Sequence, residues 1–175
     1  GQTYKEELKV QNTGTINQYV RVTIYKYWVD VNEETIDGET VLTDGGKRRD
    51  LDTDYIDLNV LTDTGWIEDT ASSTDERTVL YYSRLLEAGQ ESALFADTLT
   101  INDDIATIGS HTDEKTVTGA DGRTYTTYTT TYDYNGVKFC IEARVDAVQE
   151  HNAQDAIWSA WGKRVTITDG VLSLD

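Results

Sequence analysis

The sequence contains no proline and no methionine, and it has a single cysteine, Cys140, among its 175 residues. One cysteine cannot form a disulfide within the chain, so the count says little about the compartment. Without proline, the turns must be built from glycine, asparagine and aspartate. No apolar run approaches 18 residues, so nothing in this sequence is long and apolar enough to form a membrane-spanning helix.

Basic residues are also scarce. Lysine and arginine number 15 against 32 aspartates and glutamates, which gives a formal net charge of −17. A surface this negative repels nucleic-acid phosphates and anionic lipids. We therefore exclude nucleic-acid binding. A charge of this sign favours either solubility or cation-rich partners.

Two segments show the clearest strand pattern. In residues 19–28, Val20, Val22 and Ile24 fall on one face, and residues 137–148 alternate in the same way. A period of two over ten residues is typical of a strand with one buried face and is not produced by a helix. Shorter strands are predicted at residues 3–10, 65–67, 77–82, 92–101, 165–167 and 171–174.

Two short helices are predicted beside these strands. One spans residues 50–61, because acidic residues at its start suit the helix dipole. The other spans residues 152–161, with Asn152 as the N-cap, apolar residues at helical spacing and Gly162 after its end. Trp158 and Trp161, three residues apart on this helix, are both expected in the core.

Two further segments are predicted to be insertions. Residues 31–50 are acidic, with a hairpin expected through Asp44-Gly45-Gly46. Residues 103–131 form a long threonine-rich hairpin with its tip at Ala120-Asp121-Gly122-Arg123. Many short strands with turn signals between them favour a mainly β protein, an antiparallel β-sandwich that forms a single domain over residues 1–175.

A series of short motifs runs along the chain in a definite order. Gly1-Gln2-Thr3 is followed by Val10-Gln11-Asn12-Thr13-Gly14-Thr15, Tyr19-Val20-Arg21-Val22 and Ile24-Tyr25-Lys26-Tyr27-Trp28. Gly65-Trp66, Tyr81-Tyr82, the run from Val145 to Ala153 and Ala160-Trp161-Gly162 come later. The order and separation of these motifs resemble the TasA/camelysin family of Gram-positive exported proteins. Residues 31–49 and 110–131 lie outside the resemblance.

The resemblance implies a fold, a location and an activity. Family members fold as jelly-roll-like sandwiches, and the best known polymerise into biofilm fibres by passing an N-terminal strand into the neighbouring subunit, a form of strand addition. We therefore expect a secreted protein of the cell surface or biofilm matrix whose partners are copies of itself or other matrix proteins. Because the sequence lacks methionine and begins at Gly1, we also expect a trimmed piece of a longer precursor.

The family also includes camelysin, a surface metalloprotease, so we searched for metal ligands. His151 and Asp155 have the i, i+4 spacing of one helical turn, and Glu150 is adjacent, a set that could hold zinc. The alternative is that these residues form the entry to a helix, with Asp155 favourable near the helix N-terminus. The only other histidine, His111, is forty residues away, and no His-Glu-x-x-His motif is present.

Calcium is a second candidate metal. Asp50, Asp52 and Asp54 copy the first three ligand positions of a calcium loop. Tyr55 and Leu61 stand where that loop needs glycine and glutamate. An acidic helix start therefore explains these aspartates better, and neither calcium nor zinc is supported as a cofactor.

A nucleophilic enzyme is the remaining catalytic class. Cys140 lies in phase with Lys138, Glu142 and Arg144, on the strand face opposite Phe139. A cysteine nucleophile needs a base beside it, and a passive, half-buried thiol is the simpler interpretation. No serine-hydrolase, phosphate-loop or dinucleotide motif is present. We assign no catalytic residue.

Tyrosines at alternate positions suggest a contact surface. Tyr19, Tyr25 and Tyr27 share one face of the strand at residues 19–28. They could stack on carbohydrate or on another subunit, and they could equally pack within the sheet.

Three hypotheses for function follow from these observations. The first is an extracellular matrix or fibre subunit that assembles by strand addition. The second is a camelysin-like metal-dependent surface protease, and the third is a glycan-binding or adhesion module.

Overall fold

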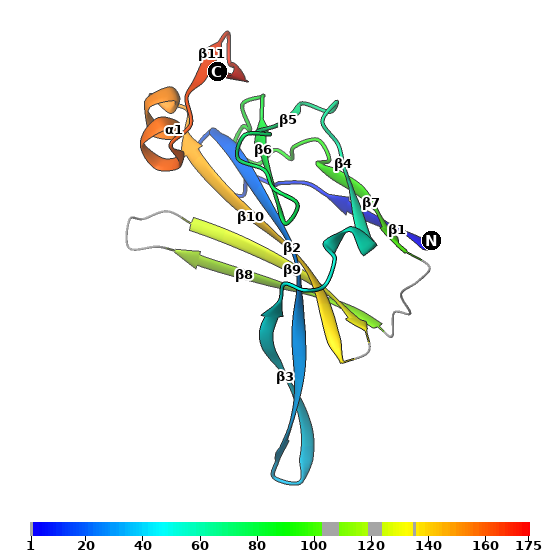
Figure 1. Ribbon diagram of the computed structural model, residues 1–175. Coiled ribbons are helices and arrows are strands. Elements are labelled where there is room, and N and C mark those ends of the chain that lie inside the picture. The colour runs from blue at the N-terminus through cyan, green and yellow to red at the C-terminus, as the bar shows by residue number, and fades with distance from the viewer. Residues whose placement is uncertain (1, 103–108, 119–123, 135) are drawn as a thin grey trace.

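The protein is described by a computed structural model that covers residues 2–102, 109–118, 124–134 and 136–175. It is mainly β, with antiparallel sheets and one short α-helix, and the described strands do not close into a barrel (Figure 1). The elements are β1 (Gln2–Leu8), β2 (Gln18–Ile36), β3 (Glu39–Arg48), the 3-10 turn η1 (Thr53–Tyr55), β4 (Ile56–Val60), β5 (Trp66–Glu68), β6 (Arg77–Tyr82), β7 (Ala96–Ile101), β8 (Gly109–Thr118), β9 (Thr124–Tyr134), β10 (Val137–Gln149), α1 (Ala153–Trp161), β11 (Val165–Thr168) and β12 (Val171–Leu174).

The two strands with the clearest alternation pair with each other at the centre of the larger sheet. β2 and β10 run antiparallel in unbroken register from Gln18↔Gln149 to Asp30↔Val137. The strand predictions for residues 19–28 and 137–148 are therefore confirmed. Val20, Val22 and Ile24 are all buried, as expected for one face of a strand.

The remaining strands assemble around this pair. The larger sheet has the order β5-β6-β2-β10-β9-β8, and β3 pairs with the distal part of β2. A smaller sheet has the order β1-β7-β4, and β11 pairs with β12 in a separate hairpin. The short strands predicted at residues 77–82, 165–167 and 171–174 are confirmed as β6, β11 and β12.

One hydrophobic core joins the two sheets. Side chains of the larger sheet such as Trp28, Trp66 and Phe139 pack with Ile56 and Leu99 of the smaller one. The Trp28 and Phe139 rings meet edge to face with centroids 5.0 Å apart. Both indole N–H groups have acceptors, since Trp28 Nε1 donates to the Asp52 carbonyl at 2.8 Å and Trp66 Nε1 to that of Ala93 at 2.9 Å. Burial of these two large rings therefore leaves neither indole donor without an acceptor.

A second, smaller core lies on the opposite face of the larger sheet. There α1 and the β11–β12 hairpin cover Tyr19 and Tyr81, and Ile157 is fully buried. The helix ends at Gly162, whose φ of +64° is the left-handed conformation that glycine adopts readily. Trp158 was expected in the core, but it is 48% exposed, so that prediction is wrong.

A partly buried charged pair lies beside this second core, with Asp146 buried and Arg21 partly exposed. Arg21 and Asp146 are register partners on β2 and β10, with Arg21 Nη2 2.7 Å from Asp146 Oδ2. The guanidinium carbon lies 4.8 Å from the Trp161 ring centroid, and the Trp161 and Tyr81 rings meet at 5.9 Å. Burial raises the pKa of Tyr81, and the nearby Arg21 charge partly opposes that rise. The pair thus connects both central strands to α1.

The helix predicted at residues 50–61 is absent from the structure. Asp52 accepts a hydrogen bond from the Asp54 backbone N–H at 2.8 Å, which caps only the three-residue turn η1. The chain then enters β4, where Ile56 and Leu58 are buried against β7 and Asp57 is exposed. The alternation of apolar residues in this segment outweighs the acidic start that suggested a helix.

The expected hairpin turn at residues 44–46 is also wrong. The chain reverses at Asp37-Gly38, where both residues have positive φ, 52° and 83°. Positive φ at both central positions is the pattern of a tight two-residue hairpin turn. Gly45 instead lies within β3, where the register skips from Val29↔Lys47 to Val31↔Asp44, a bulge.

Two further expectations are refined. The threonine-rich segment does form a hairpin of β8 and β9, but β9 also pairs with β10 and so belongs to the larger sheet. Its expected tip, 120–123, lies outside the described residues. Asn152 does precede α1, but its φ is 51° and its side chain makes no capping hydrogen bond.

Asp69, directly after β5, links two distant segments. It is 3% exposed; Oδ2 accepts from Ser72 Oγ at 2.7 Å and Oδ1 from Lys163 Nζ at 3.1 Å. Burial raises the pKa of this carboxyl, but the hydrogen bonds from Ser72 and Lys163 outweigh it and hold the pKa below its usual value. The carboxylate therefore joins the β5–β6 connection to Lys163, just after the end of α1.

We expect Asp69→Asn to lower the free energy of unfolding by about 2 kcal/mol at neutral pH, because buried hydrogen bonds to a charged group are lost. Since the pKa of Asp69 is lower in the folded state, its contribution is complete above the unfolded-state pKa of about 3.9 and is lost as pH falls. Urea denaturation should show the difference shrinking below about pH 4. Asp63→Asn, at an exposed site, is the control; a difference independent of pH would contradict this account.

Candidate functional site

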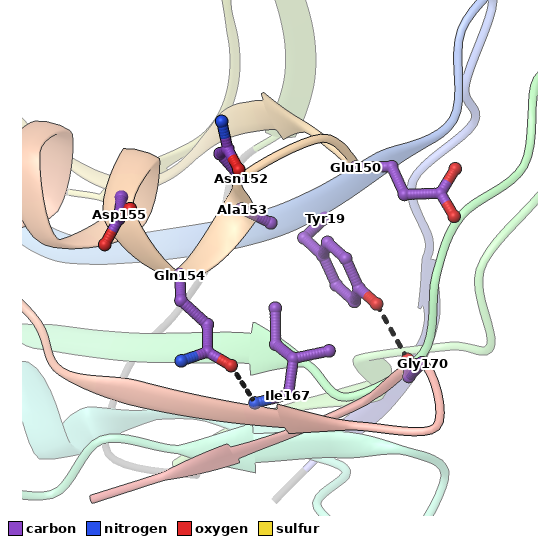
Figure 2. Close-up of a pocket in the computed structure, with 8 residues that line it drawn as sticks. All are labelled: Tyr19, Glu150, Asn152, Ala153, Gln154, Asp155, Ile167 and Gly170. Atoms are coloured by element: carbon purple, nitrogen blue, oxygen red, sulfur yellow. Dashed lines mark hydrogen bonds between the residues drawn. The ribbon is translucent and has the colours of Figure 1, made fainter.

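A groove of about 470 Å³ lies beside the second core (Figure 2). It is bounded by the start of α1, the β11–β12 hairpin and Tyr19 of β2. The Tyr19 hydroxyl donates to the Gly170 carbonyl at 2.9 Å, and the Gln154 side chain accepts from the Ile167 backbone N–H at 2.9 Å. Burial, with a further contribution from Glu150, raises the pKa of Tyr19. The first bond fastens the hairpin to β2, and the second fastens it to α1.

Two of the three candidate metal ligands, Glu150 and Asp155, line this groove, whereas His151 does not, and the three do not form a metal centre. Glu150 accepts a hydrogen bond from Asn17 Nδ2 at 3.2 Å, while the His151 ring lies 3.2 Å from Asn152 Nδ2. Asp155 lines the groove from α1, and in Figure 2 it lies well away from Glu150. Across the described residues, no group of three or more His, Cys, Asp or Glu side chains is placed to hold a metal ion.

The other polar candidates are also dispersed. Cys140 is 3% exposed, more buried than the half-buried thiol expected from its place in the sequence. Asp50 forms an ion pair with Arg48 at 2.6 Å, whose hydrogen bond lowers the Asp50 pKa to about 2. Asp52 caps η1, so these aspartates serve local structure.

The three tyrosines have different environments although they share a strand face. Tyr19 is 2% exposed and belongs to the second core, so it is not part of an open contact surface. Tyr25 and Tyr27 are half-buried. The Tyr27 hydroxyl donates to Glu142 at 3.0 Å, Lys47 Nζ lies 4.3 Å from its ring centroid, and burial followed by Glu142 raises its pKa. Of these three tyrosines, Tyr25 and Tyr27 keep part of their surface accessible.

Both sheets end in edge strands, which pair with a neighbour on one side only. β1 and β4 lie at the two ends of the smaller sheet, and β5 and β8 lie at the ends of the larger sheet's order. An edge strand has backbone donors and acceptors on one side that its own sheet does not use. Sequence analysis predicted residues 3–10 as a strand, but only the topology reveals that β1 is an edge strand paired with β7.

The comparisons with known proteins identify no relative: no family model, no curated protein and no solved structure matches this chain. No helix among the described residues has the length and apolar character needed to cross a membrane.

The placement of the tyrosines leads to a prediction about stability. Tyr19→Ala should lower the free energy of unfolding by about 3–4 kcal/mol, because it removes a buried aromatic ring and leaves a cavity. Tyr19→Phe keeps the ring and loses only the bond to Gly170, at a cost of about 1 kcal/mol. Tyr25→Ala, the matched change at a half-buried site on the same face, should cost clearly less than Tyr19→Ala. Equal losses for the two alanine variants, measured by urea denaturation, would contradict the assignment of Tyr19 to the core.

Proposed function

We propose that this protein is a secreted subunit of a surface fibre or extracellular matrix, and that its copies assemble by strand addition. The proposal includes a jelly-roll-like arrangement of the two sheets and membership of the TasA/camelysin family, as the sequence motifs suggest. Its partners would be other copies of the chain or other matrix proteins. The observation that supports it best is the way β1 is attached at the edge of the smaller sheet.

β1 is held mainly by its backbone. It pairs with β7 from Gln2↔Ile101 to Lys5↔Thr98, and a bulge precedes the Leu8↔Ala96 pair. Thr3, Tyr4 and Lys5 are exposed, so they contribute little to the hydrophobic core. Backbone hydrogen bonds depend weakly on side-chain identity, so an equivalent strand from another copy could make the same bonds.

The apolar anchors of this segment come at the end of β1 and just after it. Leu8 packs against the main core and Val10 is buried within it. Their backbone carbonyls accept from the Phe95 N–H at 2.8 Å and the Ser92 N–H at 2.7 Å. The chain is therefore fixed at residues 8–10, while the rest of β1 lies on the sheet edge. Exchange of an edge strand between copies preserves its native contacts and is a low-cost route to assembly.

The other two hypotheses have weaker support. In the described ranges no set of ligands favours the metal-dependent protease. Of the aromatic surface predicted for glycan binding, Tyr19 is buried and Tyr25 and Tyr27 are each half-buried. We therefore retain these two as alternatives only.

A cysteine pair can record which chain supplies β1. Thr3 and Thr100 are register partners with their hydroxyl oxygens 3.1 Å apart, so Thr3→Cys with Thr100→Cys places two thiols within disulfide reach. If concentrated protein exchanges β1 and is then oxidised, denaturing non-reducing gels should show a ladder of covalent oligomers. Oxidation in dilute solution should lock the monomer and abolish assembly, measured by light scattering and electron microscopy, and reductant should restore it.

Thr35→Cys with Thr40→Cys is the matched control, because this pair is also in direct register but lies within the β2–β3 hairpin. It should give only intrachain disulfides under both conditions. Assemblies of the first variant in which positions 3 and 100 are joined only within single chains would contradict exchange of β1. Protein that remains monomeric at high concentration would contradict the assembly function as a whole.

A further inference from the structure

The distal parts of β2 and β3 form an arm that extends away from the two sheets (Figure 1). We define the arm as residues 31–44, the segment that follows the last β2–β10 pair at Asp30↔Val137. It contains six register pairs, from Val31↔Asp44 to Ile36↔Glu39. At about 3.3 Å per residue, the arm reaches roughly 20 Å from its root.

The root of the arm is held by several ionic contacts. Arg48 binds Asp30 at 3.0 Å and Asp50 at 2.6 Å, and Lys138 of β10 binds Asp44 at 3.0 Å. At the bulge, a side chain on Gly45 would approach the Asp30 Cβ to 3.0 Å, so the two strands are closely apposed there. These contacts fix the direction in which the arm leaves the sheet.

The outer part of the arm combines aliphatic and acidic side chains in an unusual way. Three register pairs each place one aliphatic residue opposite one glutamate: Glu33↔Leu42, Glu34↔Val41 and Ile36↔Glu39. Their aliphatic members are exposed, Leu42 by 56%, Val41 by 37% and Ile36 by 50%. Successive pairs alternate between faces, so both faces of the ribbon carry this combination.

These pairs contribute little to the stability of the ribbon itself. Cross-strand pairs stabilise a sheet when both members are apolar or when their charges are opposite, and none of the three is of either kind. An isolated two-stranded ribbon is at best marginally stable in water. The aliphatic groups therefore leave apolar surface exposed at an acidic tip, and such surface is characteristic of an interaction site.

We propose that the arm docks onto a second protein that presents a basic surface with an apolar recess. Residues 31–46 contain five acidic residues and no basic one. A second copy of the chain is a poor match for the arm, because with 32 acidic and 15 basic residues its surface offers little excess positive charge for these carboxylates. Strand addition at β1 differs in this respect, because it relies on backbone hydrogen bonds. A small cation would neutralise the carboxylates and leave the aliphatic groups uncovered. A basic protein surface with an apolar recess would both neutralise the carboxylates and cover the aliphatic groups.

This proposal is independent of strand addition through β1. The arm and the β1 edge belong to different sheets, so one can be altered without the other. A monomeric protein could use the arm, and a fibre would display one arm per subunit.

A synthetic peptide of alternating lysine and leucine provides a probe with the required chemistry. Titrated into ¹⁵N-labelled full chain, it should shift amide signals of residues 31–44 most strongly. Ile36→Ser with Val41→Ser and Leu42→Ser keeps the charge and should weaken binding at least about tenfold. Glu33→Gln with Glu34→Gln and Glu39→Gln keeps the aliphatic groups and should weaken binding to a similar extent.

The control removes the same number of charges away from the arm, with Asp57→Asn, Asp63→Asn and Glu87→Gln at exposed sites. It should retain affinity within about twofold, because it leaves the arm intact. The spectrum of each variant outside the substituted residues verifies that it is folded. The proposal would be overturned if the peptide did not bind, or if the shifts were spread over the whole acidic surface. It would also be overturned if the serine variant bound the peptide unchanged, or if the control lost as much affinity as the glutamine variant.

Discussion

The unbroken pairing of β2 with β10 is the interaction on which the rest of the structure depends. Because side chains alternate along both strands, the pair carries two cores at once. Val22 and its neighbours on one face meet the smaller sheet, while Tyr19 and Arg21 on the other face meet α1 and the C-terminal hairpin. β6, β9 and the end of β3 at Lys47 and Arg48 all attach to this pair. A register slip of one residue would turn the aliphatic set of β2 away from its core, so both packed faces hold the same register.

The packed centre of the fold and the two proposed interaction surfaces are therefore separated in space. The centre of the larger sheet is buried on both faces, whereas β1 and the arm are attached at single edges and carry exposed side chains. Segments with few buried apolar contacts open and exchange at low free-energy cost without disturbing the core. This separation suits the proposed fibre subunit, which would remain folded while its edges pair with other chains. The acidic surface would also limit indiscriminate association, since like-charged copies repel each other outside specific contacts.

Long periodic segments were predictable from the sequence, and short segments with competing signals were not. The period of two identified β2 and β10, and the helical spacing before Gly162 identified α1. Residues 50–61 carry an acidic start, which favours a helix, and the alternating Ile56 and Leu58, which favour a strand. Pairing with β7 is what makes the segment a strand. Both Asp37-Gly38 and the segment at residues 44–46 carry residues typical of a turn, but the first forms the turn and the second forms a bulge.

Contacts between segments far apart in the chain could not be predicted from the sequence. The Arg21–Asp146 pair could not be predicted, because it depends on the register between two strands and its members are 125 residues apart in the chain. The positions of the candidate metal ligands were unpredictable for the same reason, since spacing along the chain does not reveal which groups meet in space.

Native-state hydrogen exchange tests most directly whether the β2–β10 pairing is the foundation of the fold. The account predicts that amides of residues 20–24 and 141–145 exchange most slowly and only through global unfolding, so that their opening free energies equal the unfolding free energy from urea denaturation. Amides of β1 and of the arm should exchange by local opening at much lower free energy. The account would be contradicted if the central β2 and β10 amides opened as easily as those of β1, or if β7 remained protected under conditions where the β2–β10 amides had already exchanged.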